Sequence, residues 1–154
     1  KLKICSGHFP MNVTLDKNGV TATAPARHKQ DSVVLHERMI FNIQVLAAAV
    51  DNHIFFCTTG TWRVAAATYL SRVAGTGGAA TVDVVACGAG VAPSAGVTQL
   101  DAALNLETAA EVLDRSVVIA APTEIGPGSS LALNYTGTLT SVVGCLTVEI
   151  ERIR

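Results

Sequence analysis

The sequence predicts an all-β fold, a sandwich or barrel of antiparallel strands. From Ile40 onward, short apolar or alternating runs recur roughly every 8 to 15 residues, and Gly- and Pro-rich turns separate them. Several of these runs alternate apolar and polar residues, which is typical of antiparallel sheets with one buried face. Proline is nearly absent from the runs, as expected for strands paired on both sides.

Residues 1–38 differ in character from the rest of the chain. They contain Pro10, Pro25, three of the four histidines and many charges. Val13, Leu15 and the turn-forming Asn18–Gly19 pair predict a small hairpin. We expect either an extended arm that reaches a neighbour or an ordinary first hairpin of the main sheet. The predicted organisation is therefore an N-terminal arm or small hairpin over 1–38 and a β-sandwich domain over 39–154.

The strands of the main domain are predicted from apolar runs bounded by turn residues. Glycine-rich segments at 75–79, 88–96 and 125–130 are expected to be turns or loops. The expected strands, in chain order, are 40–50, 53–59, 61–74, 80–88, 116–122, 130–135 and 145–153.

Alternation assigns faces to three of these strands. In the first, Phe41, Ile43 and Val45 share a face. In the last, Leu146, Val148 and Ile150, with Arg152 as a fourth candidate, oppose Thr147, Glu149 and Glu151. Along 61–74 the pattern groups Trp62, Val64, Ala66, Thr68 and Leu70 against Arg63, Ala65, Ala67 and Tyr69. Trp62 is expected in the core, and burial of the last strand's apolar face forbids a one-residue register slip.

Residues 97–116 allow two interpretations. Leu100, Leu104 and Leu113 lie at spacings that suit a helix, among strong helix formers. Alternatively, the first half is a strand and the second half a loop with a helical turn. We favour the strand-then-turn interpretation, because the neighbouring segments on both sides are strands.

Composition limits the classes of function. The chain has 154 residues, enough for one domain with its own core. Hydrophobic residues make up 49% and charged residues 15%, so burial of surface against partner subunits is expected. A net charge of −1 argues against nucleic-acid binding. No apolar run approaches the roughly 20 residues of a membrane span. The first ten residues lack a signal peptide's apolar region, and the start at Lys1 leads us to expect N-terminal trimming.

No catalytic, cofactor or metal site emerges from the sequence. The scattered histidines, His8, His28, His36 and His53, match no metal-ligand spacing. Cys57, Cys87 and Cys145 lie in apolar surroundings and are expected to be buried free thiols, with a disulfide or metal role, together with Cys5, as the alternative. The closest carboxylate pairs are Glu107/Glu111, Glu111/Asp114 and Glu149/Glu151, and the last pair is expected on a solvated strand face. We therefore expect a protein that is not an enzyme.

Three stretches carry a resemblance to a known group of proteins. They are TWRVAAATYLSRVAGTGGAATVDVVACGAG at 61–90, LDAALNLETAAEV at 100–112, and IGPGSSLALNYTGTLTSVVGCLTVEIERI at 125–153. Together they cover roughly 54–153. The chain resembles the capsid decoration or cement proteins and head-fibre bases of tailed bacteriophages, which are built on a jelly-roll-like β-sandwich. Gly128–Ser129 stands where that group often has Gly-Asp, and residues 1–38 match nothing in it.

The resemblance implies a structural virion protein rather than an enzyme. It implies an antiparallel jelly-roll-like β-sandwich, a homotrimer bound to the major capsid protein on the outer capsid surface, and assembly in the bacterial host cytoplasm. Neither nucleic acid nor membrane is an expected partner. The alternative is a receptor- or carbohydrate-binding β-sandwich module of a phage tail or head fibre. Only one Trp, two Tyr and four Phe are present, which makes the chain poor in sugar-stacking groups.

Overall fold

The computed structural model describes residues 13–16, 19–22, 37–47, 49, 51–56 and 59–153. The chain divides into two compact units, Lys1–Leu35 and His36–Arg154. In the first unit, strands β1 (Val13–Asp16) and β2 (Gly19–Ala22) pair antiparallel as a separate two-stranded sheet. Both strands lie within the segment for which an arm or a small hairpin was expected. Of the rest of the predicted arm, the structure describes Glu37 and Arg38, and the other residues lie outside the described part of the chain.

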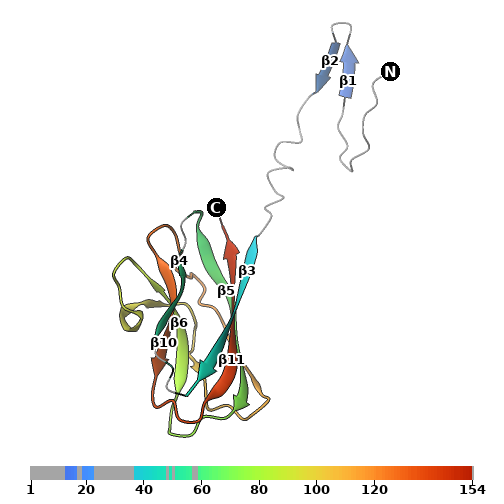
Figure 1. The fold of residues 1–154 in the computed structure, drawn as a ribbon. Helices are drawn as coiled ribbons and strands as arrows, with labels where there is room; N and C mark the ends of the chain where they lie inside the picture. Colours follow the sequence, from blue (N-terminus) through green and yellow to red (C-terminus); the bar gives the residue numbers. More distant parts are fainter. Residues whose placement is uncertain are drawn as a thin grey trace. The chain divides into compact units, whose positions relative to one another are not determined.

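The second unit consists of two antiparallel sheets that face each other (Figure 1). One sheet, named here the β3 sheet, has the strand order β3-β11-β5-β9, and the other, the β4 sheet, has the order β4-β10-β6-β7, with β8 also paired to β6. The strands are β3 (Arg38–Leu46), β4 (Asn52–Phe56), β5 (Trp62–Val73), β6 (Thr81–Cys87), β7 (Val97–Thr98), β8 (Leu104–Asn105), β9 (Leu113–Ser116), β10 (Ser130–Thr136) and β11 (Val143–Arg152).

The strand order is that of a jelly roll. The first strand of the unit, β3, pairs with the last, β11, and the second, β4, pairs with the second-last, β10. The chain passes from one sheet to the other at each of the steps β3–β4–β5–β6. The first and last strands of this unit are therefore wound together around one core. The predicted antiparallel jelly-roll-like sandwich is therefore confirmed.

The core lies between the two sheets and is formed largely by alternate residues of β5, β6, β10 and β11. Val64 and Leu146 come from the β3 sheet, and Val84 and Leu133 come from the β4 sheet; all four are buried. Trp62, as predicted, is in this core and is only 7% exposed. In β11 the buried side chains are those of Leu146, Val148 and Ile150, while Arg152 is exposed. The predicted faces of β3 and β11 are thus confirmed for their apolar residues.

The predicted faces of residues 61–74 are wrong beyond Val64. The register between β5 and β11 shifts between the pairs Glu149↔Ala66 and Ile150↔Val64, which leaves Ala65 as an extra residue. Such a β-bulge changes which residues face the core. Tyr69 is therefore completely buried and Ala67 faces the core, whereas Ala66, Thr68 and Leu70 lie on the outer face.

The segment 97–122 contains less strand than predicted. The structure has only β7 and β8 where a longer strand was expected, followed by turns, and it has no α-helix among residues 59–153. The strand expected at 116–122 instead lies earlier, at β9, and Val118 contributes only an isolated bridge to Leu100. Pairing with residues 67–70 of β5 fixes the position of β9, and this long-range contact is invisible in local periodicity.

Candidate interaction surface

The outer face of the β3 sheet is defined by the residues that alternate with the core positions. It changes in character from one end to the other. At the end where β3 begins it is charged, and at the end where β3 finishes it is apolar. Because β11 lies between β3 and β5, the cross-strand partners of its residues fix the neighbours on this face.

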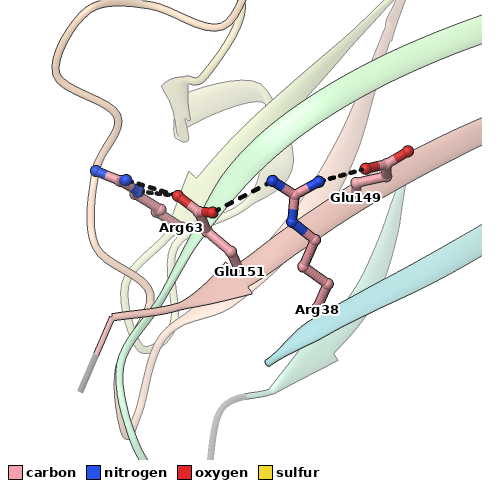
Figure 2. A network of polar contacts seen from close by, with 4 residues as sticks. All are labelled: Arg38, Arg63, Glu149 and Glu151. Atoms are coloured by element: carbon pink, nitrogen blue, oxygen red, sulfur yellow. Dashed lines mark hydrogen bonds and ion pairs between the residues drawn. The ribbon is translucent and has the colours of Figure 1, made fainter. Parts of the chain in front are cut away.

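The charged end is a row of four alternating charges, Arg63–Glu151–Arg38–Glu149 (Figure 2). Both Nε and Nη2 of Arg63 lie 2.6 Å from Oε1 of Glu151. Arg38 lies between the two glutamates, 3.6 Å from Glu149 and 3.9 Å from Glu151. The Glu151 side chain is only 11% exposed, so these pairs hold a largely buried carboxylate. The expectation of a solvated Glu149/Glu151 face is therefore wrong for Glu151.

The middle of the face is polar and the far end is apolar. Thr147 Oγ1 donates a hydrogen bond to Asn42 Oδ1 across β11 and β3, at 2.9 Å. Beyond them the cross-strand register brings apolar side chains into neighbouring rows. The exposed members are Leu46, Val73 and Leu113, each between 45% and 47% exposed. The set of Leu46, Leu70, Val73, Leu113, Val143 and Cys145 is named here the apolar end.

The outer face of the β4 sheet is partly covered by the chain itself. Val85, Cys87 and Ala132 form a second small core there, packed against Val91 of the 88–96 loop. Close packing requires Gly96, because a Cβ atom there would lie 2.8 Å from both Cys87 Sγ and Val85. The 88–96 loop therefore covers part of this face.

Burial perturbs two ionisable groups of the β4 sheet, Asp83 on its outer face and Tyr135, which packs against the main core. Burial raises the pKa of the Asp83 carboxyl, while hydrogen bonds from Thr98 and Val84 oppose the shift. Burial, with the nearby charges of Asp51 and Tyr69, raises the pKa of Tyr135 to about 12. Both groups are held in the protonated form more strongly than in water, because burial disfavours the charged form.

The carboxylates that the sequence placed close together serve separate structural roles. Glu107 accepts a hydrogen bond from the Gly78 backbone N–H at 2.7 Å, and Asp114 accepts one from the Asn105 N–H at 2.7 Å. Glu111 forms an exposed ion pair with Arg72 at 3.4 Å. Within the described residues, no group of three or more His, Cys, Asp or Glu side chains could hold a metal ion.

The structure describes only some of the cysteines and histidines. Cys87 is a buried free thiol, as predicted, and burial raises its pKa. Cys145 is free but only half-buried, because it lies on the outer face of the β3 sheet. Cys5, Cys57, His8, His28 and His36 lie outside the described residues. In the described part of the chain, no helix has the length and apolar character needed to cross a membrane.

Comparison with known proteins gives one structural likeness. No protein-family model matches the chain, and no curated protein matches it. A chain of the cyanophage Pam1 capsid asymmetric unit is similar in structure, with a TM-score of 0.44 and 15% sequence identity. The similarity covers 77% of this chain and 86% of that chain. A likeness at this level carries no argument about function.

Proposed function

We propose that this protein is a structural, non-enzymatic component of a bacteriophage virion that binds the outer capsid surface as a decoration or cement protein. The observation that carries the proposal is the jelly-roll winding of a chain whose sequence resembles that group over residues 54–153. The resemblance rests on sequence phrases alone, and the strand order is a separate property of the fold.

The described surface favours a protein whose role is to contact other protein subunits. The neighbouring carboxylates identified from the sequence are engaged in backbone hydrogen bonds or ion pairs, as at Glu107, Asp114 and Glu151. The apolar end of the β3 sheet exposes Leu46, Val73 and Leu113 together. An apolar patch on a sandwich with few charges is best accounted for by contact with other subunits. We assign these partners as the major capsid protein and further copies of this chain in a homotrimer.

The proposed mechanism is stabilisation by binding. A trimer that contacts several capsid subunits binds the assembled shell and not the separated subunits, so its binding free energy opposes their separation. Three contacts on one rigid body raise one another's effective concentration, and each contact can therefore be weak. The sandwich core, which is continuous between the two sheets, supplies the rigid body.

Residues 1–38 are assigned as the part that contacts the shell or a neighbouring subunit. A deletion that tests this should end at Leu35, the last residue of the first compact unit. It then retains Glu37 and Arg38, which form ion pairs with Arg152 and with Glu149.

The test is co-sedimentation with empty phage heads, comparing the full chain with the 1–35 deletion. Far-UV circular dichroism and thermal unfolding of the deletion variant are the folding control. We expect the full chain to sediment with heads and to raise their disruption temperature, and a folded deletion variant to lose most of this binding. Undiminished binding by the deletion variant would overturn the arm assignment. A full chain that ignores heads but binds on a glycan array would overturn the capsid role in favour of a carbohydrate-binding module.

A further inference from the structure

The free edge of β3 presents unpaired backbone groups. The N–H of Arg152 donates to the Glu37 carbonyl at 2.8 Å, and hydrogen-bonded and non-bonded pairs alternate along an antiparallel ladder. The β3–β11 register has no shift, so the odd-numbered residues of β3 direct their N–H and C=O groups toward β11. Ile40, Asn42 and Gln44 therefore direct theirs outward, where no described residue pairs with them.

This edge lacks the features that usually protect a sheet edge from pairing. Its nine residues contain no proline, no lysine and no bulge, and its only charged residue, Arg38, is at one end and engaged with Glu149. The other described edges differ. β7 has two residues and β9 four, while β4 has five and a register irregularity against β10.

We propose that the β3 edge pairs antiparallel with the β3 edge of a second copy of this chain. The pairing is centred on Asn42, so that Asn42 faces Asn42 of the second copy and Ile40 faces its Gln44. This register satisfies the outward N–H and C=O groups of Ile40, Asn42 and Gln44 on both copies. It extends the β3 sheet continuously across a two-fold axis, which is β-augmentation by an identical strand.

The side chains of β3 are compatible with themselves in this register. On the core side, Met39 faces Val45 and Phe41 faces Ile43, so apolar residues oppose apolar residues. On the outer side, Arg38 faces Leu46, and no like charges are brought opposite each other. Met39 is 40% exposed and Ile40 59% exposed in the single chain, and pairing would cover part of both. These exposed apolar groups on both faces of one edge favour a second copy over a charged partner.

The inference does not depend on the capsid role, because it requires only a second copy in solution. If the protein is also a trimer, the two-fold contact would join trimers to one another, and the smallest closed particle is a hexamer in which all three β3 edges of one trimer pair with those of another. A single nine-residue edge gives an interface at the small end of the usual range, so we expect association to depend on protein concentration.

The first test measures mass in solution by analytical ultracentrifugation of the full chain. Gln44→Pro removes an outward N–H without removing a hydrogen bond to β11, and proline is tolerated at such edge positions. Gln44→Ala changes the same side chain and keeps the N–H. We expect the particle mass to halve in Gln44→Pro and to stay unchanged in Gln44→Ala, with far-UV circular dichroism as the folding control. A wild-type mass equal to that of folded Gln44→Pro up to high micromolar concentrations would overturn the proposal.

The second test fixes the register by disulfide cross-linking. Facing residues of a hydrogen-bonded antiparallel pair have Cα atoms about 5.5 Å apart, a distance that a disulfide spans. Cys145 is replaced by Ser first, because it is the cross-strand partner of Gln44. In that background we expect Asn42→Cys to form a covalent dimer under mild oxidation and Ile40→Cys to form none above background. Equal cross-linking of both variants, or of neither, would overturn the two-fold register.

Discussion

Gly144 in β11 lies beneath the ring of Tyr69, and this contact allows a quantitative prediction. Gly144 lies within β11, where it is buried. A Cβ atom built on Gly144 would lie 2.5 Å from Cζ of Tyr69 and nearer still to Cε2 and the hydroxyl oxygen. The glycine is therefore required by the ring above it.

The loss of stability expected for Gly144→Ala follows from this overlap. Carbon atoms pack favourably at about 3.5–4.0 Å, so the ring would have to move by roughly 1 Å. Tyr69 is completely buried and surrounded by the core, so little space is open to it. Overpacking of this kind costs about 1–3 kcal/mol, and the lower entropy of the unfolded chain offsets about 0.4–1 kcal/mol. We expect Gly144→Ala to lower the free energy of unfolding by roughly 1–2 kcal/mol, or about 2–8 °C in Tm.

Gly126→Ala is the matched control, because a Cβ atom there would have no neighbour within 4 Å among the described residues. It is expected to be neutral or slightly stabilising. The free energy of unfolding of both variants is measured by urea unfolding at one protein concentration. The signal is the fluorescence of Trp62, which is the single tryptophan of the chain. In a double-mutant cycle, Gly144→Ala should cost far less when Tyr69 is replaced by Ala. If Gly144→Ala is as stable as Gly126→Ala, or if its cost persists without the tyrosine ring, the reasoning is refuted.

Three further predictions concern charged and titratable groups. Glu151→Gln should lower the free energy of unfolding in urea by about 1–3 kcal/mol, because it weakens the hydrogen bonds from Arg63 to a largely buried carboxylate. Glu111→Gln, which affects an exposed ion pair, should lower it by less than about 1 kcal/mol. Equal losses in the two variants would contradict this prediction. Burial raises the pKa of Tyr135 to about 12, against roughly 10 in the unfolded chain. The contribution of the protonated hydroxyl to stability is therefore complete below pH ~10 and is lost as the pH rises through about 12. Between these two pH values, the urea midpoint of unfolding should fall less in Tyr135→Phe than in wild type. Burial also raises the pKa of Asp83, so the stability tied to its proton is complete below pH ~3.9 and is lost as the pH rises through the folded pKa. Asp83→Asn should therefore raise the unfolding midpoint at pH 7 relative to wild type, and this gain should shrink toward pH 3.

Sequence periodicity was most successful where each strand has one core-facing and one outer face. The alternation of β11 identified Leu146, Val148 and Ile150 as core residues, and burial of all three agrees. In β5 the same method failed beyond Val64, because the bulge at Ala65 is a property of pairing with β11 rather than of the local sequence. Prediction of β9 failed for the same reason, since its position depends on pairing with β5.

By itself, the sequence determined the all-β class, most of the strands and their apolar faces, because alternation and turn residues are properties of neighbouring positions. The tertiary structure alone decided which strands are neighbours, and with them the candidate surface. Arg63 and Glu151 are 88 positions apart, and Gly144 meets Tyr69 only because β11 and β5 are adjacent. The open edge of β3 is likewise a consequence of strand order, which depends on the free energy of packing the whole chain and is not written in any single segment.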